Sequence, residues 1–171
     1  MASLMEELID VLDKECQQYD ALLKVALEKT SVIISNDLER LQSITNQEQG
    51  ILDILVNLDK KRDACMNDIA AVLNKKANRL TITNIVELMA GQPEYQKPLA
   101  KLHDKLLDLA LQLRRITTHN QDLLKDAIEM TEFDINLIQS MNQAPETANY
   151  AKGSYSGDTL GAAVSKFDTK Q

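Results

Sequence analysis

The chain contains few residues whose side chains could carry out catalysis or hold a metal. His103 and His119 are its two histidines, and they lie sixteen positions apart within one helical pattern. A di-iron site in a helical bundle needs Glu-x-x-His motifs, and neither histidine completes one. Cys16 and Cys65 are its two cysteines, and they do not form a Cys-x-x-Cys pair. We therefore expect no metal site, and we expect both thiols to be small core residues in a reducing compartment.

Motifs for nucleotide binding or acid–base catalysis are also missing from the sequence. Three of the five glycines lie near the C-terminus, which leaves Gly50 and Gly91 for the rest of the chain. Two isolated glycines cannot form the phosphate-binding loop of a P-loop or Rossmann site. Most of the 26 Asp and Glu residues lie within helical patterns, where carboxylates ordinarily solvate the surface or pair with a nearby lysine. We expect neither a catalytic site nor a cofactor.

Composition and charge indicate a single soluble domain that binds neither nucleic acid nor a membrane. The 171 residues are 44% hydrophobic and 26% charged, as expected of one soluble domain with its own core. A net charge of −7 would repel a phosphate backbone, so we expect no nucleic acid partner. The first residues are acidic where a signal peptide would be basic, and no apolar run approaches the roughly 18 residues of a membrane span. We expect a cytoplasmic protein that is not inserted in a membrane.

The periodicity of apolar residues predicts three long helices and a short one. A chain with five glycines, three prolines and 4% aromatic residues favours helices over strands. Apolar residues recur at alternating spacings of three and four, and the last such pattern is unbroken for six heptads. The expected helices cover residues 3–34, 37–74, 83–90 and 94–143. The predicted fold is all-α, an antiparallel bundle of three long helices plus one short helix.

Polar residues mark where these helices begin. Asn36 and Asp37 are good N-cap residues and predict a hairpin between the first two helices. A single helix over residues 3–74 would be about 110 Å long at 1.5 Å per residue, and it would outreach any partner helix in the chain. Thr83 and Asn84 are typical of the capped start of the short helix.

The C-terminal residues differ in composition from the rest of the chain. From Pro145 onward Ala, Gly, Ser, Thr and Lys dominate, and the spacing of three glycines does not support a helix. We therefore expect one helical bundle over residues 1–143 and a flexible tail over residues 144–171.

Five polar residues fall within the apolar stripes, where side chains are expected to be buried: Glu15, Lys29, Glu48, Arg62 and Asn120. Buried polar groups need partners and usually fix the alignment of helices. A hairpin at residue 36 places residue n of the first helix beside about residue 71 minus n of the second. A return near residue 84 places residue n of the second helix beside about residue 169 minus n of the last helix. On that arithmetic we predict a contact between the Glu48 carboxylate and the Asn120 amide.

The same arithmetic predicts that the last helix extends beyond its partner. The second helix begins near Asp37, whose partner position is about 133, so everything after Phe133 overhangs. Apolar residues at this end would receive another protein's helix or pack on the N-terminal helix, and the sequence leaves both open. The candidate residues for binding a substrate protein are Met130, Phe133, Ile135, Leu137, Ile138 and Met141.

Several ordered patterns along nearly the whole chain carry a family resemblance. They are Glu15-x-x-x-Tyr19-x-x-Leu22-Leu23, Lys29-x-x-x-Ile33-Ile34-x-x-Asp37, the segment from Glu48-x-x-Ile51 to Arg62, and Asn120-x-x-Leu123-Leu124-Lys125-Asp126-Ala127-Ile128. Together with Tyr150-Ala-Lys-Gly153 and the ending Phe167-Asp168 in the tail, they resemble the FlgN-type flagellar export chaperones. One departure is Thr117, which stands where this family often carries the first Asn of an Asn-x-x-Asn pattern.

The resemblance implies a chaperone without a cofactor. Proteins of this family bind the C-terminal helices of flagellar hook-filament junction proteins, mainly through their own C-terminal helix region, before export. A tail tyrosine helps the loaded complex dock on the cytoplasmic domain of the export gate. By position this docking role passes to Tyr150 with Gly153, and Tyr155 is a second candidate because two Tyr-Gly patterns overlap.

A structural or adaptor coiled coil that acts as a homodimer is the alternative, because the same apolar stripes could pair two copies. Stoichiometry separates the two hypotheses. A chaperone should form a one-to-one complex with a junction-protein fragment, whereas an adaptor should be a dimer that ignores the fragment.

Overall fold

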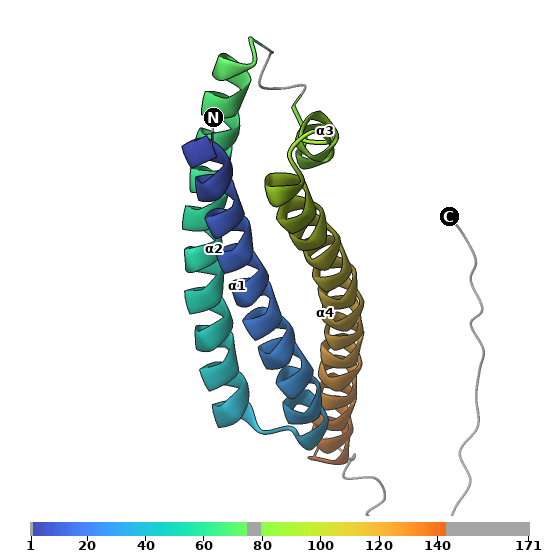
Figure 1. Cartoon of the computed structure of the whole chain (residues 1–171). Helices are drawn as coiled ribbons and strands as arrows, with labels where there is room; N and C mark the ends of the chain where they lie inside the picture. The colour runs from blue at the N-terminus through green and yellow to red at the C-terminus, as the bar shows by residue number, and fades with distance from the viewer. Residues whose placement is uncertain (1, 75–79, 143–171) are drawn as a thin grey trace, which may run out of the picture. The chain divides into compact units, whose positions relative to one another are not determined.

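The computed structural model describes residues 2–74 and 80–142, which form four α-helices and contain no strand (Figure 1). The helices are α1 (Ala2–Ser35), α2 (Leu38–Val72), α3 (Ile82–Leu88) and α4 (Pro93–Asn142). The predicted all-α class, with three long helices and a short one, is confirmed. Each helix end lies within two residues of the expected position. None of these four helices is long and apolar enough to cross a membrane. The expected flexible tail lies outside the described residues.

The turn between α1 and α2 is built by Asn36 and Asp37. Asn36 has a φ of 55°, the left-handed conformation that commonly ends a helix. Its N–H donates to the Ile33 carbonyl at 3.1 Å, and the Asp37 N–H donates to the Val32 carbonyl at 3.3 Å, which are the two bonds of a Schellman motif. The Asp37 side chain then accepts from the Arg40 N–H at 2.9 Å and caps α2. The two residues expected to form the hairpin therefore do so.

The short helix α3 is capped two residues earlier than expected. Thr81 is its N-cap, because the Thr81 hydroxyl accepts from the Asn84 N–H at 3.1 Å and the Asn84 Oδ1 accepts from the Thr81 N–H at 3.1 Å. The expected cap at Thr83 is wrong. Asn84 closes the capping box here, in a place where Glu or Gln is more usual, so the motif does not stand out in the sequence.

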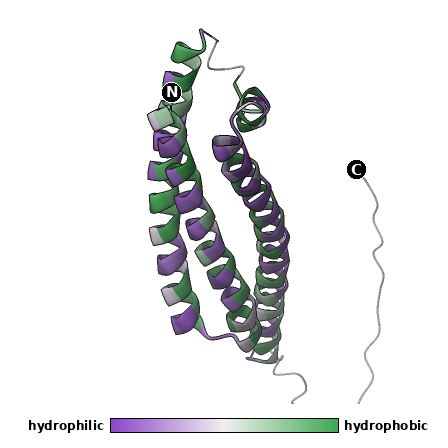
Figure 2. Cartoon of the chain, in the orientation of Figure 1, coloured by the Kyte–Doolittle hydropathy of each residue, from purple (hydrophilic) through white to green (hydrophobic). Residues whose placement is uncertain are grey.

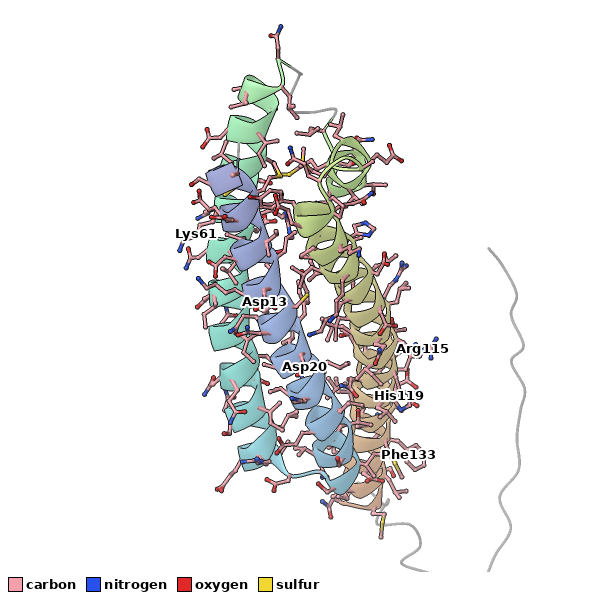
Figure 3. The ribbon with its side chains drawn as sticks, viewed as in Figure 1. Asp13, Asp20, Lys61, Arg115, His119 and Phe133 are labelled. Carbon is pink, nitrogen blue, oxygen red and sulfur yellow. The ribbon has the colours of Figure 1, made fainter. Side chains whose placement is uncertain are left out.

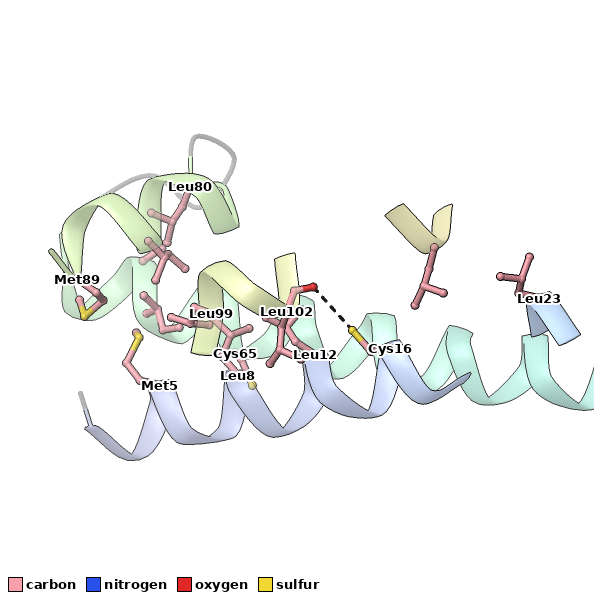
Figure 4. Packing of buried hydrophobic residues seen from close by; sticks show 14 residues of the cluster. Met5, Leu8, Leu12, Cys16, Leu23, Cys65, Leu80, Met89, Leu99 and Leu102 are labelled. Atoms are coloured by element: carbon pink, nitrogen blue, oxygen red, sulfur yellow. Dashed lines mark hydrogen bonds between the residues drawn. The ribbon is translucent and has the colours of Figure 1, made fainter. Parts of the chain in front are cut away.

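The hydrophobic core lies where the N-terminal half of α1 meets the other three helices (Figure 4). Met5, Leu8 and Leu12 of α1 are each 0% exposed. The same cluster contains Cys16, Leu23, Cys65, Ile69, Ala70, Leu80, Ile85, Met89, Leu99, Leu102 and Leu109. Full burial of one large aliphatic side chain stabilises a fold by about 1.5–3 kcal/mol. This cluster therefore fixes α3 and the beginning of α4 against α1.

Hydrogen bonds show that α4 runs parallel to α1. The Cys16 thiol donates to the Leu102 carbonyl at 3.7 Å, and the Asn120 amide donates to the Ala26 carbonyl at 2.8 Å, so positions rise together along both helices. The hairpin makes α2 antiparallel to both. Hydrophobic and hydrophilic positions alternate along all three long helices, as the stripes in the sequence predict (Figure 2).

Both cysteines are free and buried. Burial raises the pKa of the Cys16 thiol and of the Cys65 thiol, so both stay protonated and inert at neutral pH. Their packing is that of the small core residues expected from the sequence.

Candidate functional site

Two ion pairs join α1 to α2 within their apolar interface. The Arg62 Nη1 donates to both carboxylate oxygens of Glu15 at 2.9 Å, and the Glu15 side chain is only 2% exposed. The Lys29 Nζ lies 2.6 Å from the Glu48 carboxylate, and each of these side chains is 18% exposed. Four of the five polar residues found in the apolar stripes are therefore partners of one another. Their arrangement indicates a structural role, because each charge is already neutralised by its neighbour.

The Glu15 carboxylate has a raised pKa. Burial raises this pKa most, and the Arg62 guanidinium lowers it only in part. Arg62 also pairs with Asp59 one helical turn away. Removal of the guanidinium would leave a buried carboxylate without its counter-charge, which is costly in a protein interior.

The alignment of α1 with α2 differs from the predicted one. Arg62 faces Glu15, where about position 56 was expected, and Glu48 faces Lys29, where about position 42 was expected. Helical side chains lean toward the N-terminus of their own helix. In an antiparallel pair this lean moves both contacts toward higher positions on α2 by about one position per helix, so it accounts for the sense of the displacement and for part of its six positions.

Asn120 is the one buried polar side chain described on α4, at 4% exposure. Its amide donates to the Ala26 carbonyl at 2.8 Å, and its Oδ1 accepts from the Thr30 hydroxyl at 2.6 Å. The predicted contact between Asn120 and Glu48 is wrong, because Glu48 pairs with Lys29. The pairing arithmetic related α4 to α2, whereas Asn120 faces α1.

An apolar cavity of about 220 Å³ opens at the hairpin end of the bundle, which we define as the region formed by the end of α1, the turn, the start of α2 and the facing part of α4. The lining residues are Val32, Ile33, Asn36, Asp37, Leu38, Leu41, Leu124, Ala127, Ile128, Thr131 and Glu132. Val32 and Ile33 are 8% and 7% exposed, whereas Leu38 and Ile128 are 70% and 57% exposed. The cavity therefore has a packed floor and an open apolar rim.

The sequence interpretation missed this cavity. Leu41 and Ala127 occupy ordinary stripe positions, and such positions predict packing against a neighbouring helix. The signal that could have been used is Leu38, a large apolar residue directly after the N-cap, in a first turn that usually carries polar or acidic side chains.

The candidate substrate-binding residues lie exposed along the end of α4. Their exposed fractions run from 47% for Leu137 to 70% for Met130, and Phe133 is 65% exposed (Figure 3). The set comprises Met130, Phe133, Ile135, Leu137, Ile138 and Met141. One compact unit ends at Glu132, so Met130 belongs to it and the remaining five residues lie beyond it. A binding role for these side chains stays a prediction.

The docking candidates Tyr150, Gly153 and Tyr155 lie outside the described residues. Their role remains a prediction based on the resemblance alone.

Neither histidine lines the cavity at the hairpin end or belongs to the candidate substrate-binding set at the end of α4. His119 is exposed on α4 (Figure 3), and the His103 ring is within 3.4 Å of the Thr83 hydroxyl and 3.2 Å of the Asp104 carboxylate. Within residues 2–74 and 80–142, no group of three or more His, Cys, Asp or Glu side chains could hold a metal ion.

Comparison with known proteins identifies a family. A family model described as "FlgN protein" matches residues 1–156. The chain is also similar to a protein named "Flagella synthesis protein FlgN" from Proteus mirabilis, with 26% identity over 144 residues that cover 83% of this chain and 86% of that protein. No solved structure matches the chain.

Proposed function

Because the chain belongs to the FlgN family, we propose that it binds the C-terminal helices of flagellar hook-filament junction proteins and delivers them to the flagellar export gate. The family implies a role in flagellar export as a chaperone, with flagellar proteins as partners. The identity of the cargo and the delivery step are the parts that we propose.

The observation that carries the proposal is the exposed apolar end of α4. Phe133, Ile138 and Met141 are 65%, 58% and 69% exposed. Burial of each side chain against a partner would lower the free energy. A helix with such a face is suited to receive the apolar stripe of an amphipathic partner helix. If the cargo helix orders on binding, the loss of conformational entropy offsets about 2–5 kcal/mol of the contact free energy. The complex therefore stays releasable.

Binding of this kind requires no chemistry from the chaperone. Helix packing supplies the affinity, and unloading would be the task of the export apparatus. We propose that the loaded chain docks on the cytoplasmic domain of the export gate through Tyr150, with Gly153 and Tyr155 beside it in the sequence.

The cargo proposal is tested with the full chain and a C-terminal fragment of a junction protein. Light scattering should show a one-to-one complex, and calorimetry should show binding weakened about tenfold or more in a Phe133→Ser, Ile138→Ser double variant. The matched control is Leu107→Ser, Leu111→Ser, because Leu107 and Leu111 are 56% and 59% exposed on the same helix. Equal losses in both variants, or a homodimer that ignores the fragment, would support the adaptor alternative.

The docking proposal needs a separate measurement. Tyr150→Ala should weaken binding of the loaded complex to the purified cytoplasmic domain of the gate, while affinity for the junction fragment stays unchanged. Tyr155→Ala is the matched control. Loss of gate binding in Tyr155→Ala alone would move the docking role to Tyr155, and loss in neither variant would remove it from the tail tyrosines.

A further inference from the structure

The cavity at the hairpin end supports a more specific description of the partner, and this inference rests on the proposed function. We propose that the cavity receives one large apolar side chain of the partner helix, and that this helix carries Lys or Arg beside that anchor. The chaperone would thereby select a basic amphipathic helix over an acidic one.

The size and lining of the cavity fit an apolar anchor. An apolar cavity of about 150 Å³ in another protein holds a benzene ring, so a cavity of about 220 Å³ has room for a Leu or Phe side chain. Val32 and Ile33 form its floor and are fixed by the packing of α1, whereas Leu38 and Ile128 stand open at its rim. A preformed pocket with an open apolar rim is typical of the places where a single anchor residue contributes most of the binding energy.

Charges around the cavity are mainly negative. Asp37, whose carboxylate also caps α2, and Glu132 line it, and Glu39 and Asp126 are the sequence neighbours of the lining residues Leu38 and Ala127. The nearby cations are already engaged, since Arg40 pairs with Glu28 and the Lys125 Nζ lies 3.8 Å from the Glu129 carboxylate. A partner with Lys or Arg beside its anchor would meet complementary charge here.

The same charges argue against a second copy of this chain as the occupant. Two copies joined through this cavity would bring Asp37 and Glu132 of each close to the same carboxylates of the other, and like charges across an interface are unfavourable. The net charge of −7 adds to this repulsion. A basic helix from a different protein is therefore the occupant that the structure favours.

The first test fills the cavity from inside. Ala127 lines it, so Ala127→Leu should occupy the anchor position and leave the thermal midpoint of unfolding unchanged or raised. Binding of the junction fragment should weaken about tenfold or more. Ala110→Leu is the matched control, because Ala110 is an exposed alanine of α4 that lines a different hollow, with Tyr19 and Thr117, and this variant should bind as the unmodified chain does. An Ala127→Leu variant that folds and binds normally would overturn the proposal.

The second test changes the charge at the rim. Glu132→Lys should weaken binding by about fivefold at low salt, and the effect should fade at high salt because exposed charges are screened. The control is Asp108→Lys, which makes the same change in net charge at an exposed position of α4 away from the lining residues. Equal effects of the two variants would show that only net charge matters and would overturn the charge selection.

A third measurement separates this inference from the proposed function. The probes are two synthetic amphipathic peptides, one built from Leu and Lys and one from Leu and Glu. The Leu–Lys peptide should shift the methyl NMR signals of Leu124 and Ile128 in the unmodified chain and not in Ala127→Leu, and the Leu–Glu peptide should shift neither. If the junction fragment fails to bind and the Leu–Lys peptide still does so, the cargo assignment fails and the anchor site stands. If both peptides bind alike, or neither shifts these signals, the anchor site is wrong.

Discussion

The two ends of the bundle are held together by different kinds of contact. At the closed end, which we define by Met5, Leu8 and Leu12 with their neighbours on α2, α3 and α4, apolar side chains are fully buried in one cluster. At the hairpin end α4 is held to α1 by the hydrogen bonds of Asn120, and the buried side chains Val32 and Ile33 border an open cavity. We therefore expect the closed end to carry most of the stability, so that the partner proposed for the hairpin end would bind without unfolding the bundle.

The largest expected effect comes from truncating the closed end. Leu8→Ala should lower the free energy of unfolding by about 3 kcal/mol, because Leu8 is fully buried and the lost packing leaves a cavity. Leu38→Ala at the hairpin end is the matched control, and its effect should stay within about 0.5 kcal/mol because Leu38 is 70% exposed. Urea unfolding measures both. Equal losses would break the contrast between the two ends.

The ion pair between Arg62 and Glu15 gives a second, pH-dependent effect. Arg62→Ala should cost about 3 kcal/mol at neutral pH, because it leaves the buried Glu15 carboxylate without a counter-charge. Burial holds the folded pKa of Glu15 above its ordinary value of 4.5. A group with a raised folded pKa favours the folded state below its ordinary pKa and loses that contribution as pH rises through the folded pKa.

The cost of Arg62→Ala should therefore shrink as pH falls toward 4.5 and Glu15 takes up a proton. Adding Glu15→Gln should remove this pH dependence and recover part of the stability at neutral pH. Urea unfolding at several pH values measures the effect. A cost of Arg62→Ala that is the same at every pH would mean that the Glu15 charge is not the source of the instability.

A smaller effect is expected at Asn120, where α4 meets the hairpin end. Asn120→Leu should cost about 1 kcal/mol, because the Thr30 hydroxyl loses its acceptor at 2.6 Å and keeps only the longer contact with the Ala26 carbonyl at 3.3 Å. Thr30→Val combined with Asn120→Leu should be less destabilised than the two single effects predict, since both partners of the hydrogen bond are then apolar. Strict additivity in this double-mutant cycle would show that the contact contributes nothing to the docking of α4.

The parts of this fold that could be predicted from sequence depend on local interactions. Asn36 and Asp37 mark the hairpin because one residue adopts the left-handed conformation and the next caps the following helix, and both preferences act within a few residues. The partners of Asn120 could not be predicted, because a stripe on α4 does not say whether it faces α1 or α2. The alignment of Glu15 with Arg62 was missed in part because the pairing arithmetic left out the lean of side chains along two helices.

One part of the candidate site could likewise be predicted from the sequence, and another part could not. The apolar residues at the end of α4 could be proposed from the sequence because they lie beyond the last paired position that the arithmetic gives, and the structure shows them exposed. Their binding role stays a prediction. The cavity could not be proposed in this way, because it is made by residues from three separate segments, and Val32, Leu41 and Leu124 each look like ordinary core positions in the sequence.

The smallest expected effect concerns Gly50, which lies within α2 away from the closed-end cluster. A Cβ added at Gly50 would meet no atom within 4 Å, and Gly50 has no positive φ, so alanine should fit without strain. Gly50→Ala should raise the free energy of unfolding by about 0.5–1 kcal/mol, because glycine loses more backbone entropy than alanine on entering a helix.

Gly91→Ala is the control for this substitution. Gly91 also has open space for a Cβ, but it lies between α3 and α4, so it lacks the helix-propensity part of the gain. The midpoint temperature of thermal unfolding should therefore rise more for Gly50→Ala than for Gly91→Ala. A Gly50→Ala variant that is more stable yet binds the junction fragment less tightly would show that α2 must bend at this glycine for binding. The hairpin end would then be a moving element and not a preformed site.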